Sequence, residues 1–153
     1  MNVNLKFFLK DTIRKMVDFS KTAQNRGLPP PPLQKPYPLG AELVRLAGPG
    51  QWRGVRETPV AEAMAARKSH RSFRQELFTQ DELGFLLWAT QGLRKAPGLT
   101  GGLRTVPSAG CRHAFETYLA IYRVQGIDPG VYRYLPIEHA LIEAVQVEDL
   151  EEE

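Results

Sequence analysis

The sequence contains very little cysteine: Cys111 is the only one among 153 residues. A single cysteine excludes an intrachain disulfide and a zinc site built from several thiolates. The three histidines, His70, His113 and His139, are spaced too far apart to resemble a metal-binding motif, so we expect no metal. This cysteine usage is typical of a protein from a reducing compartment.

Long hydrophobic runs are also missing. The longest apolar stretches, residues 85–89 and 119–122, fall far short of the roughly 20 residues that span a bilayer. Near the N-terminus the apolar residues are interrupted by charge, and no small-residue cleavage site of the signal-peptide kind follows. We therefore expect a cytoplasmic protein without a membrane-spanning segment.

Charge is unevenly distributed in a composition that is otherwise ordinary, with 42% hydrophobic and 24% charged residues. Residues 1–75 carry 14 Lys/Arg against 5 Asp/Glu, whereas residues 76–153 carry 6 against 12. The basic half can attract a phosphate-bearing ligand, nucleic acid, the acidic half or a partner subunit. We do not expect nucleic-acid binding, because no helix-turn-helix, zinc-finger or ribonucleoprotein motif accompanies the charge.

The chain divides into an N-terminal helix and proline-rich arm over residues 1–57 and one domain over residues 58–153. Residues 5–17 have apolar positions at helical spacing, which predicts a short amphipathic helix. Residues 27–38 are rich in proline, which fixes φ and lacks an N–H donor, so this segment should be extended. We favour a strap over the protein's own surface, or over its partner's, above a ligand for an aromatic-grooved domain.

Two helices are predicted in the second region. Thr58 and Pro59 form a good helix start, and the residues that follow give an apolar stripe for packing: Val60, Ala61, Met64 and Ala65. Thr79 and Glu82 form a capping box for a second helix, which Gly92 can terminate. One face of that helix is expected to contain Leu83, Leu86, Leu87 and Thr90.

Strands are expected in the last third of the chain. Residues 115–124 and 131–135 read as an antiparallel pair joined by an Asp-Pro-Gly turn, and residues 140–147 as a third strand. The glycine-containing segment 94–104 favours a mobile loop. The aromatic side chains of this region can stack on a substrate, but core packing is the preferred interpretation for Trp88, Tyr118, Tyr122, Tyr132 and Tyr134.

Two clusters carry residue types suited to binding. The first is Arg67-Lys68-Ser69-His70-Arg71-Ser72-Phe73, whose cations and hydroxyls can hold a phosphate and sugar hydroxyls. The second is Pro107-Ser108-Ala109-Gly110, where small residues allow the backbone to approach a flat ring and the Ser108 hydroxyl can bond to its edge. A solvated helix end and an ordinary turn would have the same residues. Cys111 follows the turn, and we expect it to be an inert small side chain.

Together these segments resemble the nitroreductase family, nearest its SagB-type dehydrogenase branch. Arg67, Lys68, Ser69, Arg71 and Phe73 match the family's Arg-Arg/Lys-Ser-x-Arg-x-Phe motif. Residues 86–92 match the helix end Leu-Leu-Trp-Ala-x-Gln-Gly, and Arg104, Pro107, Ser108 and Gly110 match Arg-x-x-Pro-Ser-x-Gly. The motifs occur in the family's order and cover nearly the whole chain.

The resemblance implies an α+β fold with an antiparallel-rich central sheet flanked by helices, and a homodimer that binds FMN at its interface. It assigns Arg67, Lys68, Ser69 and Arg71 to the flavin of one site, and Pro107, Ser108, Ala109 and Gly110 of the other subunit to the same flavin. Hydride would pass from NAD(P)H to the flavin and then to a nitroaromatic or quinone, or away from a heterocycle in a modified peptide. Lys68 and Arg71 would stabilise the anionic reduced flavin. No residue is assigned as catalytic acid or base.

The sequence departs from the family pattern by ending at Glu153. Family members continue with a helix, further strands, a glycine-containing segment that faces the flavin and a late basic residue. We therefore expect the C-terminal part of the fold to be missing. Either the sequence is a fragment, or a natural short product keeps the fold by borrowing a partner, or another chain supplies the missing portion. The alternative is a catalytically incomplete subunit that acts as an assembly or binding partner.

Overall fold

The computed structural model describes residues 11–29, 31–98 and 101–145, which fall into two compact units, Met1–Pro32 and Leu33–Glu153. The first unit holds two 3-10 helices, η1 (Asp11–Met16) and η2 (Phe19–Lys21). The helix predicted over residues 5–17 is therefore 3-10 rather than α over its described part, and residues 5–10 lie outside the described residues. Met16 is 73% exposed, so this segment lacks the packing that stabilises most protein α-helices.

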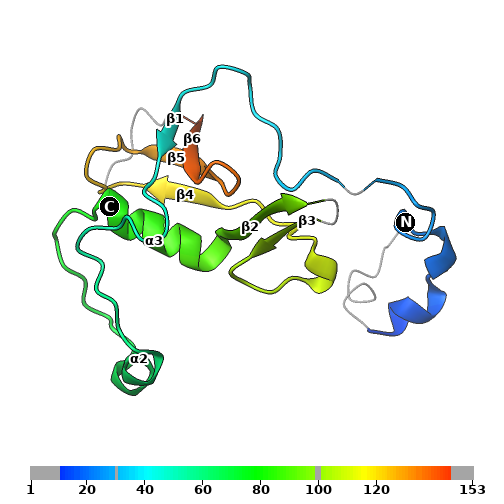
Figure 1. Cartoon of the computed structure of the whole chain (residues 1–153), viewed down its shortest axis with the longest axis horizontal. Coiled ribbons are helices and arrows are strands. Elements are labelled where there is room, and N and C mark those ends of the chain that lie inside the picture. The colour runs from blue at the N-terminus through cyan, green and yellow to red at the C-terminus, as the bar shows by residue number, and fades with distance from the viewer. Residues whose placement is uncertain (1–10, 30, 99–100, 146–153) are drawn as a thin grey trace, which may run out of the picture. The chain divides into compact units, whose positions relative to one another are not determined.

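The second unit is built on a four-stranded antiparallel sheet with the order β1-β6-β5-β4 (Figure 1). These strands are β1 (Leu43–Arg45), β4 (Tyr118–Ile121), β5 (Gly130–Leu135) and β6 (Ala140–Val145). The predicted antiparallel pair is confirmed by β4 and β5, where Leu119 lies opposite Tyr132. The third predicted strand is confirmed as β6, with residues 146–147 outside the described part, and the α+β class is confirmed with it.

Strand β1 was not predicted. Three residues are too few to show the alternation by which a strand is identified. It is an edge strand that pairs with β6, with Val44 opposite Leu141. Its backbone is thus ordered by a partner almost 100 positions later in the chain.

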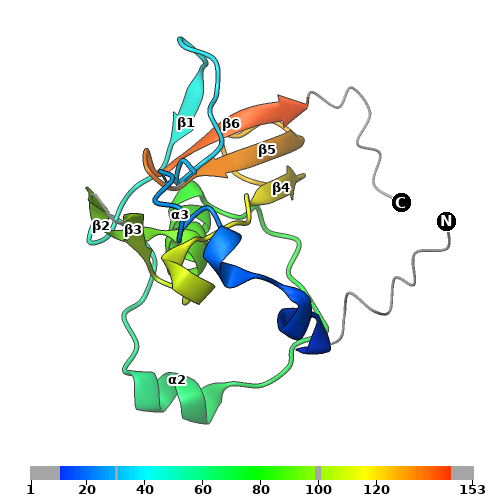
Figure 2. The same cartoon turned by 90° about the vertical axis from the view of Figure 1, so that its right-hand side faces the viewer.

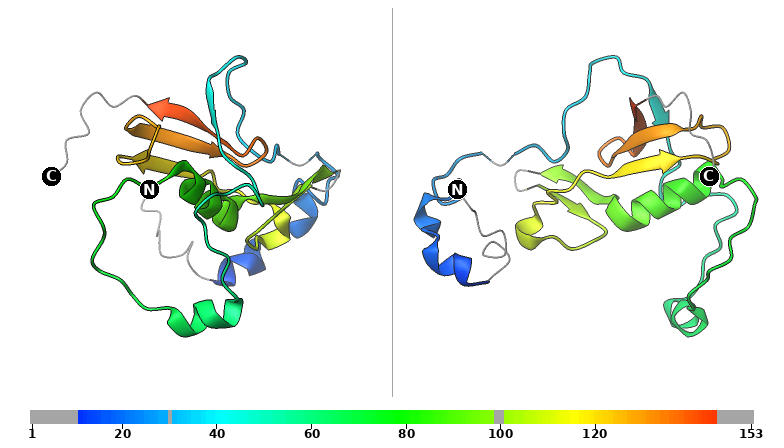
Figure 3. Two further views of the ribbon diagram at one scale, coloured as in Figure 1. Left: turned by 60° about the vertical axis from the view of Figure 1, so that its left-hand side comes forward. Right: turned by 180° about the vertical axis from the view of Figure 1, so that it is seen from behind.

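Helix α3 (Gln80–Gln91) lies along one face of the sheet (Figures 1 and 3). The predicted capping box is present: the Thr79 hydroxyl accepts from the Glu82 backbone N–H at 3.2 Å, and the Glu82 carboxylate accepts from the Thr79 N–H at 2.9 Å. Hydrogen bonds from Thr79 lower the pKa of Glu82. Leu83 and Leu87 are buried against the sheet as expected, but Leu86 is 48% exposed. The predicted face was therefore wrong for Leu86, and also for Thr90, which is exposed.

The buried core lies between α3 and the sheet. It is formed by side chains from the helix, from β4, β5 and β6, from the residue after β1 and from the β4–β5 connection: Leu46, Leu83, Leu87, Ile121, Ile127, Tyr132, Tyr134 and Leu141. Core packing is thus confirmed for Tyr132 and Tyr134, which are 5% and 1% exposed. It is wrong for Tyr118 and Tyr122, which are 50% and 47% exposed.

Helix α2 (Val60–Ala66) begins where predicted but does not pack as predicted. Pro59 is its N-cap residue and no side-chain cap bond is made, so Thr58 does not cap the helix. Val60 and Met64 are 75% and 74% exposed. Figure 2 shows α2 at the far end of a long loop, away from the sheet of its own unit. The apolar stripe therefore has no cover within the described part of this chain.

The segment expected as a mobile loop is a hairpin instead. β2 (Leu93–Gly98) pairs antiparallel with β3 (Gly101–Arg104), and residues 99–100 are not described. A Cβ on Gly102 would lie 2.5 Å from Cδ2 of Leu93, so glycine permits the close approach of the two strands. The glycines that suggested a loop thus serve strand pairing.

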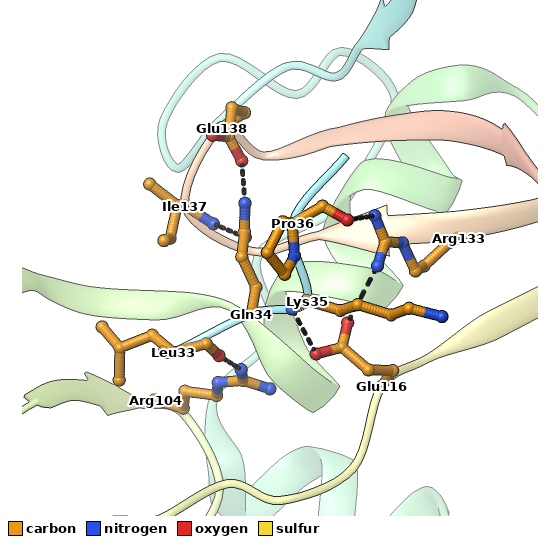
Figure 4. A network of polar contacts seen from close by, with 9 residues as sticks. All are labelled: Leu33, Gln34, Lys35, Pro36, Arg104, Glu116, Arg133, Ile137 and Glu138. Atoms are coloured by element: carbon orange, nitrogen blue, oxygen red, sulfur yellow. Dashed lines mark hydrogen bonds and ion pairs between the residues drawn. The ribbon is translucent and has the colours of Figure 1, made fainter. Parts of the chain in front are cut away.

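Part of the proline-rich arm, residues 33–38, lies on the protein's own surface, and we call it the strap; Figure 4 shows its first four residues. Its backbone carbonyls at Leu33 and Pro36 accept hydrogen bonds from Arg104 and Arg133 at 2.9 and 3.2 Å. The Gln34 amide donates to the Glu138 carboxylate at 2.7 Å. The predicted strap over the protein's own surface is confirmed by these contacts, but Leu33 and Gln34 form a bend instead of an extended segment. No helix among the described residues has the length and apolar character to cross a membrane.

Candidate functional site

A pocket of about 340 Å³ lies beside the small-residue turn. It is lined by Gln91 from the end of α3 and by residues 106–109 and 112–115. This volume is near the lower end of the range of small-molecule sites. Pro107, Ser108 and Ala109 of the predicted site therefore share one pocket, whereas Gly110 lies in the adjoining 3-10 turn η3 (Ala109–Cys111) and does not line it. We call it the Ser108 pocket.

The turn has an unusual backbone. Gly110, Cys111 and His113 have φ angles of 61°, 56° and 46°, a region that glycine enters freely and other residues rarely. The Ser108 hydroxyl accepts from the His113 backbone N–H at 2.8 Å, and the Ser108 carbonyl accepts from the Cys111 N–H at 3.0 Å. Since the hydroxyl oxygen is acting as an acceptor, its own hydrogen remains available for a ligand.

His113 supplies the pocket with an imidazole. Burial and, to a smaller extent, the charge of Arg104 lower its pKa, so the ring is neutral at pH 7. Its Nε2 lies 3.8 Å from Sγ of Cys111. Cys111 is half-buried and does not line the pocket.

Arg104 lies behind the pocket and is only 6% exposed. One guanidinium nitrogen, Nη1, donates to Oε1 of Gln91 at 3.2 Å, and the other, Nη2, donates to the Leu33 carbonyl of the strap (Figure 4). Burial lowers the pKa of Arg104, and the nearby charge of Glu116 opposes that shift. The sequence interpretation named Arg104 only as part of a motif and missed Gln91, although Gln91 lies in the helix-end motif that ends at Gly92.

The basic segment is placed quite differently. Residues 67–73 follow α2 without regular structure and are exposed throughout. Within the described part of the chain, the side chains of Arg67, Lys68, Ser69 and Arg71 make no hydrogen bond or ion pair with one another or with the turn. One chain therefore leaves the two predicted halves of the site apart.

Metal binding has no evident site in the described ranges, where no group of three or more His, Cys, Asp or Glu is arranged to hold an ion. A second pocket, of about 220 Å³, lies against β1, β5 and β6. It contains the carboxylates of Glu42, Asp128 and Glu143, and none of the predicted site residues lines it.

Comparisons with known proteins agree with the geometry of the fold. No protein-family model matches the sequence. A curated protein of Methanocaldococcus jannaschii described as a "putative nitroreductase" is 30% identical over 94 residues, which are 61% of this chain and 46% of that protein. The crystal structure of a "putative nitroreductase" from Ralstonia eutropha is similar with a TM-score of 0.51 and 30% identity, over 76% of this chain and 52% of that one.

The fold of the protein is thus nitroreductase-like. The two similarities, one in sequence and one in structure, support the resemblance to the nitroreductase family that the motifs indicated. The chain spans about half the length of each protein, 46% and 52% respectively.

Proposed function

We propose that the protein is an FMN-dependent oxidoreductase of the nitroreductase family, nearest the SagB-type branch. It would pass hydride between NAD(P)H, the flavin and a nitroaromatic, quinone or heterocyclic substrate. The observation that carries this proposal is the Ser108 pocket, because the matched Pro-Ser-Ala segment lines a ligand-sized cavity in a nitroreductase-like fold. The single cysteine supports a cytoplasmic location.

The residues of the pocket fit the edge of a flavin ring. Pro107 and Ala109 present small surfaces to a flat ring, and the Ser108 hydroxyl has a hydrogen to donate to a ring oxygen. FMN, when bound, supplies the hydride chemistry, and the protein supplies binding and orientation. The exposed cations Arg67, Lys68 and Arg71 are suited to the flavin phosphate, which binds guanidinium and ammonium groups through charge-assisted hydrogen bonds.

We propose that the complete site needs two chains. The basic segment and the turn do not meet within one chain, so a second copy, or another subunit, must bring one to the other. The apolar stripe of α2 supports association, since Val60 and Met64 are 75% and 74% exposed and exposed apolar surface favours contact with a partner. The stripe directly precedes the basic segment, so docking of α2 would place Arg67 near the interface.

Equilibrium dialysis against FMN tests the proposal. The purified chain should take up FMN and turn yellow, and the double variant R67A/R71A should bind it at least tenfold more weakly, because each lost charge-assisted bond contributes about 1.5–3 kcal/mol. Arg56→Ala is the matched control, because Arg56 is exposed, precedes α2 in the sequence and lies outside the motif. It should change the affinity less than twofold.

Two results would count against the proposal in different ways. A chain that takes up no FMN is not a flavoprotein on its own. Unchanged affinity in R67A/R71A would leave the flavoprotein but remove these residues from its site.

A further inference from the structure

The contact between Arg104 and Gln91 fixes the chemical character of the Ser108 pocket. A guanidinium group can only donate hydrogen bonds, so the atom of the Gln91 amide within 3.2 Å of it must be the oxygen. The Gln91 oxygen is therefore turned toward Arg104, with one of its two lone pairs used. The group that the amide presents away from Arg104 is its NH2, which carries two donors.

Arg104 is held firmly enough to impose this orientation. Its side chain is 6% exposed, and its second terminal nitrogen donates to the Leu33 carbonyl at 2.9 Å. The negative charge of Glu116 favours the charged form of the Arg104 guanidinium. A buried guanidinium that loses an acceptor is costly, so the contact with Gln91 should persist.

We propose that Arg104 is a positioning residue that, by holding the Gln91 oxygen, makes the Ser108 pocket a hydrogen-bond donor site for carbonyl or anionic oxygens. The Ser108 hydroxyl adds to the same polarity, because its oxygen accepts from the His113 N–H and its hydrogen stays available. The identification of that ligand with the carbonyl-bearing edge of FMN rests on the proposed function. Arg104 does not line the pocket and acts through Gln91.

The same cation influences a second pocket residue. Burial is the larger cause of the lowered pKa of His113, and the positive charge of Arg104 is the smaller one. The imidazole therefore stays neutral at pH 7 and adds no charge to the pocket. Arg112, which also lines the pocket, is a cation and adds to its donor character.

Arg133 provides a matched control. It is equally buried, at 5% exposed, and it also donates to a strap carbonyl, that of Pro36 at 3.2 Å (Figure 4). Among the described residues it makes no hydrogen bond with Gln91. Arg104→Met and Arg133→Met each remove one bond to the strap, and Arg133→Met also removes an ion pair with Glu116 at 4.0 Å, but only Arg104→Met releases the Gln91 amide.

The experiment measures FMN affinity and the NMR signals of the Gln91 side-chain NH2 group in both variants. Arg104→Met should weaken FMN binding about three- to tenfold, the effect of one misoriented hydrogen-bonding group, and should shift the Gln91 signals. Arg133→Met should leave the FMN affinity and the Gln91 signals unchanged within error. This should hold even if Arg133→Met lowers the thermal midpoint as much as Arg104→Met does. Equal changes in the two variants would show that Arg104 has only a structural role and would overturn the inference.

Gln91→Glu keeps the test decisive if Arg104→Met does not fold. A carboxylate still accepts from Arg104 but has no donor for the pocket, so the thermal midpoint should hold while FMN affinity drops at least threefold. Unchanged affinity in Gln91→Glu would overturn the inference. Failure of the unsubstituted chain to take up FMN would refute the proposed function instead, and the Gln91 signals of the two arginine variants would still decide the role of Arg104.

Discussion

The hydroxyl of Tyr134 lies 2.7 Å from Nδ1 of His139, and Nε2 of the same ring lies 2.9 Å from the Ala47 carbonyl oxygen. A carbonyl only accepts, so Nε2 carries the hydrogen. Burial lowers the pKa of the ring, so above pH 6.5 the imidazole is neutral and its Nδ1 accepts from the tyrosine. This arrangement ties the turn between β5 and β6 to the segment that follows β1, with Tyr134 buried in the core beneath it.

This bridge predicts a stability that depends on pH. Burial lowers the pKa of His139 below its ordinary 6.5, so the unfolded chain takes up the proton first as pH falls. Stability should therefore be complete above pH 6.5 and should decline as pH drops through the folded-state pKa. Urea unfolding at pH 7.5 and 5.5 measures the loss.

The control for this prediction is His139→Asn, because asparagine does not titrate here and tolerates the positive φ of 48° at this position. The variant should lose less stability between the two pH values. Its remaining dependence belongs to His113, whose pKa is also lowered. An unchanged dependence on pH would contradict the role of His139.

Gln34 is expected to anchor the strap. Its amide donates to Glu138 at 2.7 Å and its oxygen accepts from the Ile137 N–H at 3.1 Å, in a side chain that is 8% exposed. Gln34→Ala leaves two polar groups without these partners and should lower the free energy of unfolding by about 1–3 kcal/mol. Gln125→Ala, at an exposed position, should change it by less than 0.5 kcal/mol, roughly the range of surface substitutions. Chemical denaturation compares the two, and equal effects would refute the anchor.

The two helix starts should respond differently to the same substitution. Thr79→Ala removes the capping box of α3 and should cost about 1 kcal/mol. Thr58→Ala, at the helix that has no side-chain cap, should cost almost nothing. Thermal unfolding of both variants provides the comparison. A comparable loss in Thr58→Ala would mean that this residue does cap α2.

Association through α2 is expected to depend on its apolar stripe. The double variant V60S/M64S should shift the sedimentation coefficient toward that of a single chain, because it removes the apolar side chains available to a partner. Leu39→Ser is the control, since Leu39 is fully exposed but lies outside α2. It should leave the sedimentation unchanged. Unaltered association in V60S/M64S would exclude α2 from the contact.

Local signals in the sequence predicted local structure well. The capping box of Thr79 and Glu82 fixed the start of α3 because both groups lie within one turn of helix. The Asp-Pro-Gly turn predicted the pairing of β4 with β5 for the same reason. The strap was predicted only in part: it contacts the protein's own surface, but Leu33 and Gln34 form a bend, because proline restricts only its own φ and that of these two residues stays free.

Structure set by distant contacts could not be predicted. β1 is ordered by its pairing with β6. The hairpin of β2 and β3 depends on the close approach of Gly102 and Leu93, whereas the glycine content of this segment, taken alone, predicted a loop. The apolar stripe of α2 predicted the helix but not what covers it, because periodicity shows only that a face is apolar.

The site could be predicted only in part. Pro107, Ser108 and Ala109 line one pocket, and their assignment to the flavin, with that of Gly110, stays a prediction. Gln91 was missed, because its importance arises from the Arg104 guanidinium, which is adjacent in space and 13 positions away in the chain. The assignment of Arg67, Lys68, Ser69 and Arg71 to the flavin stays a prediction.

Subunit complementation tests the central claim, a flavin site shared between two chains, most directly. R67A/R71A lacks the proposed phosphate ligands, and Ala109→Trp fills the Ser108 pocket from an exposed position, so each variant alone should bind little FMN. In an equal mixture half of the dimers combine both variants, and each of these regains one of its two sites. Dialysis should then show about a quarter of the unsubstituted protein's FMN capacity. A mixture that binds no more FMN than its two components do separately would contradict the shared site.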